Sequence, residues 1–195
     1  MFVFRFRKLT IAFDFSFFAS VSLLILLGSG YAVLGLAACL LHELGHLAVM
    51  RCCGIPAKRV LFYGAGIKII PDKDFCFTDF CSEILILIAG SSANFLIAAV
   101  SGLSNGFGMR LFSVINVFIG IFNLLPLQYL DGGRLLLAVI RKICSFSTAC
   151  LLERFLKWAN IFLTLSAMII FAFAGMGNFT LYITFCYLLI SAAFC

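Results

Sequence analysis

The chain has 195 residues, of which 64% are hydrophobic and only 11% carry a charged side chain. A soluble domain has roughly 45–50% apolar and about 25% charged residues, so this composition excludes one and indicates a protein whose main solvent is lipid. The net charge of +6 does not indicate nucleic-acid binding, because the basic residues lie in small groups between apolar runs. We therefore expect contact with a lipid bilayer and none with nucleic acid.

Long apolar runs predict the architecture. A hydrocarbon core about 30 Å thick requires roughly 20 apolar residues per helix. Six segments approach or exceed this length: Ile11 to Leu27, Tyr31 to Met50, Ser82 to Leu103, Leu111 to Ile140 with an interruption, Phe155 to Ala174, and Phe179 to Ala193. The expected fold is an all-α polytopic membrane protein with about six transmembrane helices.

The basic residues predict the orientation of these spans. If the N-terminus lies in the cytosol, every Lys and Arg except Arg110 falls on the cytosolic side. Cytosolic loops of membrane proteins are enriched in Lys and Arg, so this arrangement is favoured over its inverse. We expect a multi-pass protein of the cell membrane with both termini in the cytosol.

The segment between the second and third spans, Pro56 to Phe77, is too polar to cross the bilayer. Two short strand-like runs, Val60 to Tyr63 and Ile67 to Ile70, flank the turn signal Gly64-Ala65-Gly66. This pattern predicts a small β-hairpin at the cytosolic face. We find no repeat or second domain and expect a single domain over residues 1–195.

The second span contains the sequence His42-Glu43-Leu44-Gly45-His46, which includes both histidines of the chain. On a helix, residues i and i+4 lie on one face, so both imidazoles can reach one metal ion and Glu43 can handle a water proton. The alternative is a packing cluster without metal, which would leave costly polar groups in hydrocarbon. The pattern therefore favours a zinc site with Glu43 as the catalytic residue.

A catalytic zinc ion needs a third protein ligand besides His42 and His46, and Asp131 is the natural candidate. It is the only acid of the broken fourth span, where Pro126 and the pair Gly132-Gly133 interrupt the helix. Irregular backbone at membrane depth occurs where it is buried in protein or lines a polar cavity. A compatible alternative is that Asp131 is the N-cap of a helix resuming at Gly132.

These motifs resemble the site-2 protease family of intramembrane zinc metalloproteases, and more closely its short bacterial branch, which includes the sporulation protease that processes a sigma-factor precursor. The resemblance covers about half of the chain. It rests on residues 42–46, on Gly90 to Asn94, on Asn123 to Pro126 and on Leu130 to Arg134.

The resemblance implies one zinc ion per chain, bound by His42, His46 and Asp131, with Glu43 as general base. It also implies hydrolysis of a peptide bond in or near a transmembrane segment of a membrane-protein substrate. Further residues are expected to support the site or bind substrate: Asn94, Asn123, Pro126, Gly132 and Gly133.

The sequence departs from the family at two places. The family commonly has Pro where Ser91 stands and a Pro-rich stretch where Gln128-Tyr129 stands. We expect neither a PDZ domain nor a regulatory nucleotide-sensing domain, and the sequence does not identify an inhibitor or partner subunit. The alternative functions are a catalytically inactive adaptor that binds transmembrane helices and a metal transporter, although transporters often have a second broken segment that this chain lacks.

Overall fold

The computed structural model describes residues 2–6, 9–15, 17–18, 21–22, 30–63, 66–71, 79–127 and 130–173. The chain divides into two compact units, Met1–Leu124 and Leu125–Cys195. Among the described residues, the elements with defined bounds are a four-stranded sheet and three helices in the first unit and two helices in the second. The sixth predicted span, Phe179 to Ala193, lies outside the described residues.

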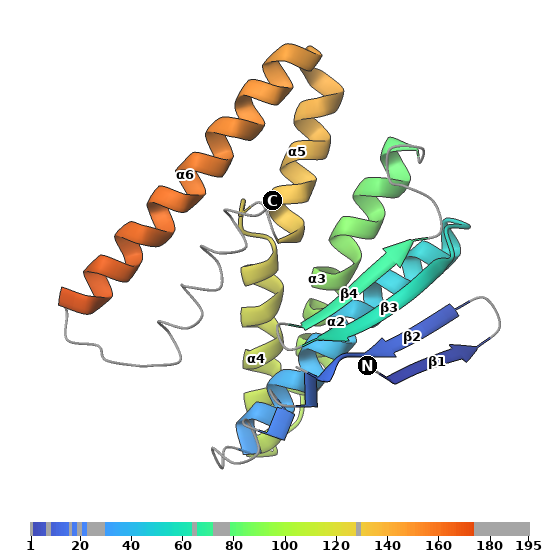
Figure 1. Cartoon of the computed structure of the whole chain (residues 1–195). Helices are drawn as coiled ribbons and strands as arrows, with labels where there is room; N and C mark the ends of the chain where they lie inside the picture. Colours follow the sequence, from blue (N-terminus) through green and yellow to red (C-terminus); the bar gives the residue numbers. More distant parts are fainter. Residues whose placement is uncertain are drawn as a thin grey trace. The chain divides into compact units, whose positions relative to one another are not determined.

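The sheet has the strand order β1-β2-β3-β4 (Figure 1). Its strands are β1 (Phe2–Phe6), β2 (Leu9–Phe13), β3 (Ala57–Tyr63) and β4 (Gly66–Pro71). Strands β1 and β2 pair antiparallel, β2 and β3 pair parallel, and β3 and β4 pair antiparallel. The predicted hairpin is therefore confirmed, but it forms half of a larger sheet.

The first predicted span is wrong at its start, because residues 11–13 belong to β2. Hydropathy alone did not separate this strand from a helix, since a short apolar run is ambiguous without its pairing partner. That partner is β3, which follows more than forty residues later and aligns Ile11 with Val60 and Phe13 with Phe62. The rings of Phe13 and Phe62 stack with their centroids 4.5 Å apart.

The described part of the first unit also contains the helices α2 (Gly30–Cys52), α3 (Phe80–Gly102) and α4 (Phe107–Asn123). Helices α2 and α3 approach closely because small residues meet between them. A Cβ on Gly45 would lie 2.8 Å from both the Ala89 carbonyl oxygen and the Ala93 Cβ. Near the end of α2, Met50, Ile55 and Ile86 form an apolar core that Ile69 of β4 also contacts.

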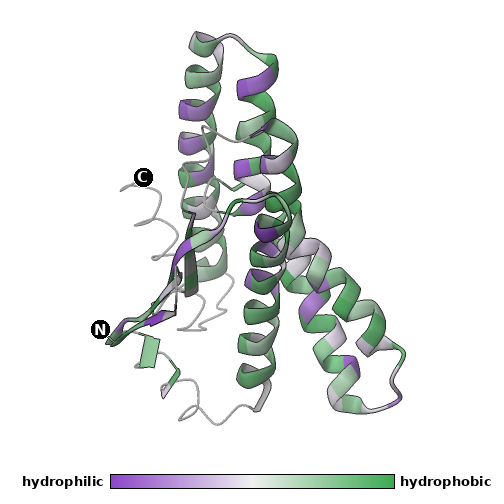
Figure 2. Ribbon diagram, turned by 90° about the vertical axis from the view of Figure 1, so that its right-hand side faces the viewer, coloured by the Kyte–Doolittle hydropathy of each residue, from purple (hydrophilic) through white to green (hydrophobic). Residues whose placement is uncertain are grey.

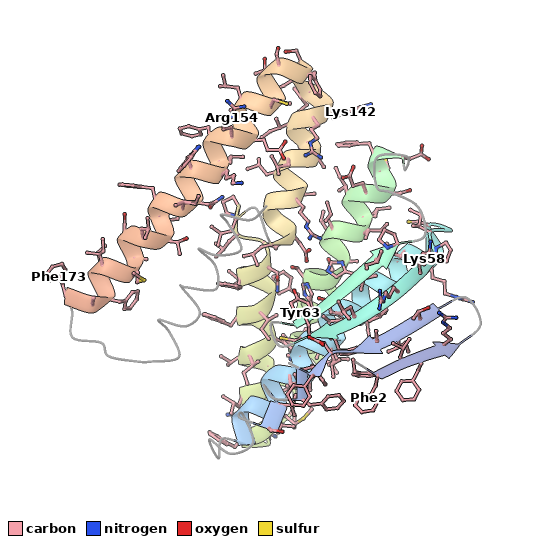
Figure 3. The ribbon with its side chains drawn as sticks, in the orientation of Figure 1. Phe2, Lys58, Tyr63, Lys142, Arg154 and Phe173 are labelled. Atoms are coloured by element: carbon pink, nitrogen blue, oxygen red, sulfur yellow. The ribbon has the colours of Figure 1, made fainter. Side chains whose placement is uncertain are left out.

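The second unit contains α5 (Asp131–Ile143) and α6 (Phe146–Phe173). An ion pair joins the helices, with Arg141 Nη2 lying 3.0 Å from Glu153 Oε1. Figure 3 labels Lys142 and Arg154 near the turn between them and Phe173 at the far end of α6. The predicted interruption of the fourth span is confirmed, because α4 ends at Asn123 and α5 begins at Asp131.

Most helical residues are hydrophobic (Figure 2). Within the described residues, three helical stretches are long and apolar enough to cross a membrane: Val33–Cys52, Phe80–Gly102 and Phe146–Phe173. Helix α4 is apolar but shorter, with 17 residues. The protein is thus a mostly helical, multi-pass membrane protein with a small sheet, and three of its helices are span candidates.

Candidate metal centre

The two histidines lie side by side on α2, both buried, with 4% and 8% of their surfaces exposed. Their ring centroids are 4.8 Å apart, and the ring planes are nearly perpendicular. The Nε2 atoms of His42 and His46 are separated by 3.1 Å. The helix therefore directs one nitrogen of each ring to the same point, as the spacing of four residues predicts.

A contact with the backbone defines the tautomer of the His46 ring. Its Nδ1 lies 2.7 Å from the carbonyl oxygen of Ile86 on α3. A carbonyl oxygen only accepts hydrogen bonds, so Nδ1 carries the hydrogen and donates it, and Nε2 of the neutral ring keeps its lone pair. Histidines that bind metals usually donate their second ring nitrogen in this way, which orients the ring.

The ring nitrogens fit a zinc ion. Two nitrogens bound to one tetrahedral zinc at about 2.0–2.1 Å lie roughly 3.3 Å apart, close to the separation of the two Nε2 atoms. Neutral imidazole is also a preferred zinc ligand. The histidine pair therefore matches half of a tetrahedral coordination sphere.

Gly90 of α3 makes room for the two ligand nitrogens. A Cβ at this position would lie 2.6 Å from Nε2 of His42, and it would also collide with Nε2 of His46. Only a residue without a side chain can occupy this place without moving the rings. The sequence alone does not show that the residues packed against Gly90 are the two histidines.

Glu43 follows His42 on α2 and is half-buried. The residue after it, Leu44, is 54% exposed, so Glu43 stands between the buried histidine face and the outer surface of the helix. Adjacent residues on a helix are about 100° apart, which places the carboxylate beside the imidazoles and not among their packing partners.

Asp131 is the first residue of α5 and is half-buried. The N-cap of this helix is Leu130, with extended backbone and no capping hydrogen bond from a side chain. The prediction that Asp131 caps a helix starting at Gly132 is therefore wrong by one residue, and the carboxylate lies in the first turn, where the helix dipole favours negative charge. Gly132 and Gly133 are both buried.

The remaining predicted residues lie at three separate positions. Asn94 is on α3, one turn beyond Gly90, and is fully buried. Asn123 is the last residue of α4, and its Nδ2 donates a hydrogen bond of 3.0 Å to the Ile119 carbonyl of the same helix. Pro126 follows α4, where its missing N–H and fixed backbone prevent the helix from continuing.

Comparisons with known proteins show what the chain is similar to. Residues 103–170 match the model of Peptidase family M50. A zinc metalloprotease of Methanocaldococcus jannaschii is 33% identical over 111 residues, covering 52% of this chain and 32% of that protein. The Rip3 protein of Mycobacterium tuberculosis is 31% identical over 133 residues, covering 59% of this chain and 32% of that protein.

The fold matches as well. A site-2 protease from Methanocaldococcus jannaschii aligns over 98% of this chain and 94% of the solved one, with a TM-score of 0.71 and 24% identity. The chain therefore shares the fold of that site-2 protease and is similar in sequence to Peptidase family M50 over residues 103–170. Its aligned region spans about a third of the length of the curated relatives described above.

Proposed function

We propose that this chain belongs to the site-2 protease family, Peptidase family M50, and is an intramembrane zinc metalloprotease that hydrolyses peptide bonds of membrane proteins. The geometry of the histidine pair carries the proposal. His42 and His46 present two nitrogens 3.1 Å apart inside an otherwise apolar helix. Ionisable groups in such a helix are costly, and a shared metal ion accounts for both.

We further propose that Asp131 completes the zinc site. His42, His46 and Asp131 each offer one ligand atom, and a carboxylate oxygen beside two imidazole nitrogens is a ligand set of catalytic zinc sites. Three protein ligands leave the fourth position for water or substrate, whereas a fourth protein ligand would close the site. The family resemblance assigns the same three residues.

A zinc ion held by His42, His46 and Asp131 would act as a Lewis acid toward the scissile carbonyl and the attacking water. Glu43 accepts a proton from the attacking water and delivers it to the nitrogen of the leaving amine. The hydrogen bond from His46 to Ile86 keeps its ring oriented throughout. The peptide bond is replaced by a carboxyl group and an amine, with one water molecule consumed.

The substrate class follows from the surroundings of the site. A helix in the bilayer keeps its amides bonded internally, so the segment to be cut has to unwind first. Strand β4 has a neighbour only on its β3 side within the described sheet. An unwound segment can pair with the other side of β4, gaining main-chain hydrogen bonds with little demand on sequence.

We propose supporting roles for five residues around this reaction. Pro126, Gly132 and Gly133 keep the chain between α4 and α5 irregular, which favours water access at membrane depth. Asn94 and Asn123 support the site or the substrate, as the family resemblance implies. The closer likeness to the sporulation branch is likewise part of this proposal.

The proposed topology has six spans with both termini in the cytosol. Because β2 and β3 pair directly, both strands lie on one side of the bilayer. The chain must therefore cross an even number of times between Phe13 and Ala57, and α2 accounts for one crossing. This requirement agrees with a first span that starts after Phe13 and not at Ile11, and the positive-inside rule places the sheet in the cytosol.

The test compares membrane-protein fragments in cells that express the wild type or the Glu43→Gln variant. Gln keeps the size of the side chain but cannot accept the proton, so cleavage products present with the wild type should be absent with the variant. Zinc content and membrane insertion should be unchanged in the variant. Equal cleavage by both proteins would remove Glu43 from the mechanism, whereas zinc binding without cleavage in the wild type would favour the adaptor.

A further inference from the structure

Three polar side chains are fully buried where α3 meets α4. Ser91, Asn94 and Asn116 have 0% exposure and are the largest fully buried side chains of the described residues. We call this group the polar seam. In an apolar bundle, polar groups at such positions are costly unless they are hydrogen-bonded.

Most polar atoms of the seam have no hydrogen-bond partner among the described residues. These atoms are Ser91 Oγ, Asn94 Oδ1, Asn94 Nδ2 and Asn116 Oδ1. Asn116 Nδ2 is the exception, because it donates to the Phe112 carbonyl of its own helix over 2.8 Å. The seam therefore offers both acceptors and a donor that require a partner.

Two contacts locate Asn116 opposite Asn94. Ser113 Oγ donates to the Ala98 carbonyl of α3 over 2.7 Å, and a Cβ on Gly120 would lie 2.7 Å from the Phe95 ring. Asn116 lies between Ser113 and Gly120 on the same face of α4, so it faces the turn of α3 between Phe95 and Ala98. Asn94 immediately precedes that turn.

We propose that the polar seam binds internal water, held by Ser91, Asn94 and Asn116. A buried water requires two to four polar partners, and it can accept from Asn94 Nδ2 while donating to Asn116 Oδ1. A metal cation is disfavoured as the occupant, because it would leave the amide donor of Asn94 unpaired. A substrate peptide is disfavoured because none of the three side chains is exposed.

Water bound in the polar seam affects the metal centre because the seam lies close to it along α3. Asn94 lies one turn from Gly90, which contacts both histidines, and two turns from Ile86, whose carbonyl orients His46. A water molecule that bridges α3 and α4 at this level holds α3 in place against α4. Asn116 is thus a positioning residue that acts through water and α3, and not a catalytic residue.

The test is radiolytic hydroxyl labelling of the full chain in lipid nanodiscs, read by mass spectrometry. Radicals formed from bound water label the side chains beside it, so Phe95 should be labelled above lipid-facing Phe118. The label should disappear in Asn116→Leu and persist in Ser113→Ala, because the Ser113 hydroxyl already bonds the Ala98 carbonyl. Asn116→Ser keeps a polar group and should retain the label if the Leu variant fails to fold.

Two results would overturn the proposal. Labelling of Phe95 no higher than that of Phe118 in the wild type would show a dry seam or a bound cation. Persistence of the label in folded Asn116→Leu would show that water near Phe95 does not depend on Asn116. Because no protease activity is measured, failure here leaves the proposed enzymatic function untouched.

Discussion

At the residue scale, the metal centre depends on a glycine as much as on its ligands. Gly90 occupies the space against the Nε2 atoms of His42 and His46. A methyl group there has to displace a ring or part the helices α2 and α3, and a displaced ring no longer directs its nitrogen to the shared point. The close contact of α2 with α3 and the positions of the two ligand nitrogens therefore depend on the same residue.

Gly90→Ala is expected to lose most of its bound zinc. Alanine favours a helix over glycine by roughly 0.5–1 kcal/mol, so any loss reflects the collision with the histidines and not a weaker helix. Gly35→Ala is the matched control, because no atom lies within 4 Å of a Cβ at that position of α2. Zinc content and thermal unfolding of both variants in detergent check this, and full zinc occupancy in Gly90→Ala would contradict the packing at the site.

Asp131→Asn tests the third ligand. The amide keeps the size of the side chain but loses its charge, so zinc affinity should fall by more than the ~10- to 100-fold typical for loss of an outer-shell partner. Competition with a chelator of known affinity measures the change. Unchanged affinity would limit Asp131 to stabilising the first turn of α5, where its charge is favourable.

At the element scale, the proposed addition of an unwound substrate to the edge of the sheet can be tested directly. Ile69 lies on β4 at one edge of the sheet, and Phe4 lies on β1 at the other. A photo-crosslinking amino acid at position 69 should capture a membrane-protein substrate in the Glu43→Gln background. The same group at position 4 should capture much less, and equal capture at both edges would argue against strand addition at β4.

Local patterns predicted elements whose partners are close in sequence. The β-hairpin of β3 and β4 follows from two strand-like runs around a turn, and the break between α4 and α5 follows from Pro126 and the glycine pair. Strand β2 was missed, because its assignment depends on pairing with β3 across more than forty residues, and β1, which pairs with β2, was missed with it. Sequence periodicity does not encode such a long-range partner.

The same limit applies to the site. The spacing of His42, Glu43 and His46 on a helix predicted the shared face, and the structure confirms it for the two histidines. The carbonyl of Ile86 and the contact of Gly90 come from a second helix about forty residues away. Backbone groups have no residue-type signature, so only the packing of α3 on α2 reveals them.

At the scale of the whole molecule, the apolar composition, the sequence similarity to Peptidase family M50 and the histidine geometry agree on one account. Seven polar side chains are buried among the described residues, and five of them belong to the metal centre or the polar seam. A chain of this composition gains little from polar groups in hydrocarbon unless they bind an ion, water or each other. The metal therefore links the sequence motif to the proposed protease activity.

The most direct test is the zinc content per chain of the purified, detergent-solubilised protein beside the His46→Ala variant. About one zinc per chain is expected in the wild type, because its ligands form a single site, and little in the variant, which lacks a ligand. A well-folded wild type that binds no zinc after supplementation, or a variant that binds as much as the wild type, would contradict the account.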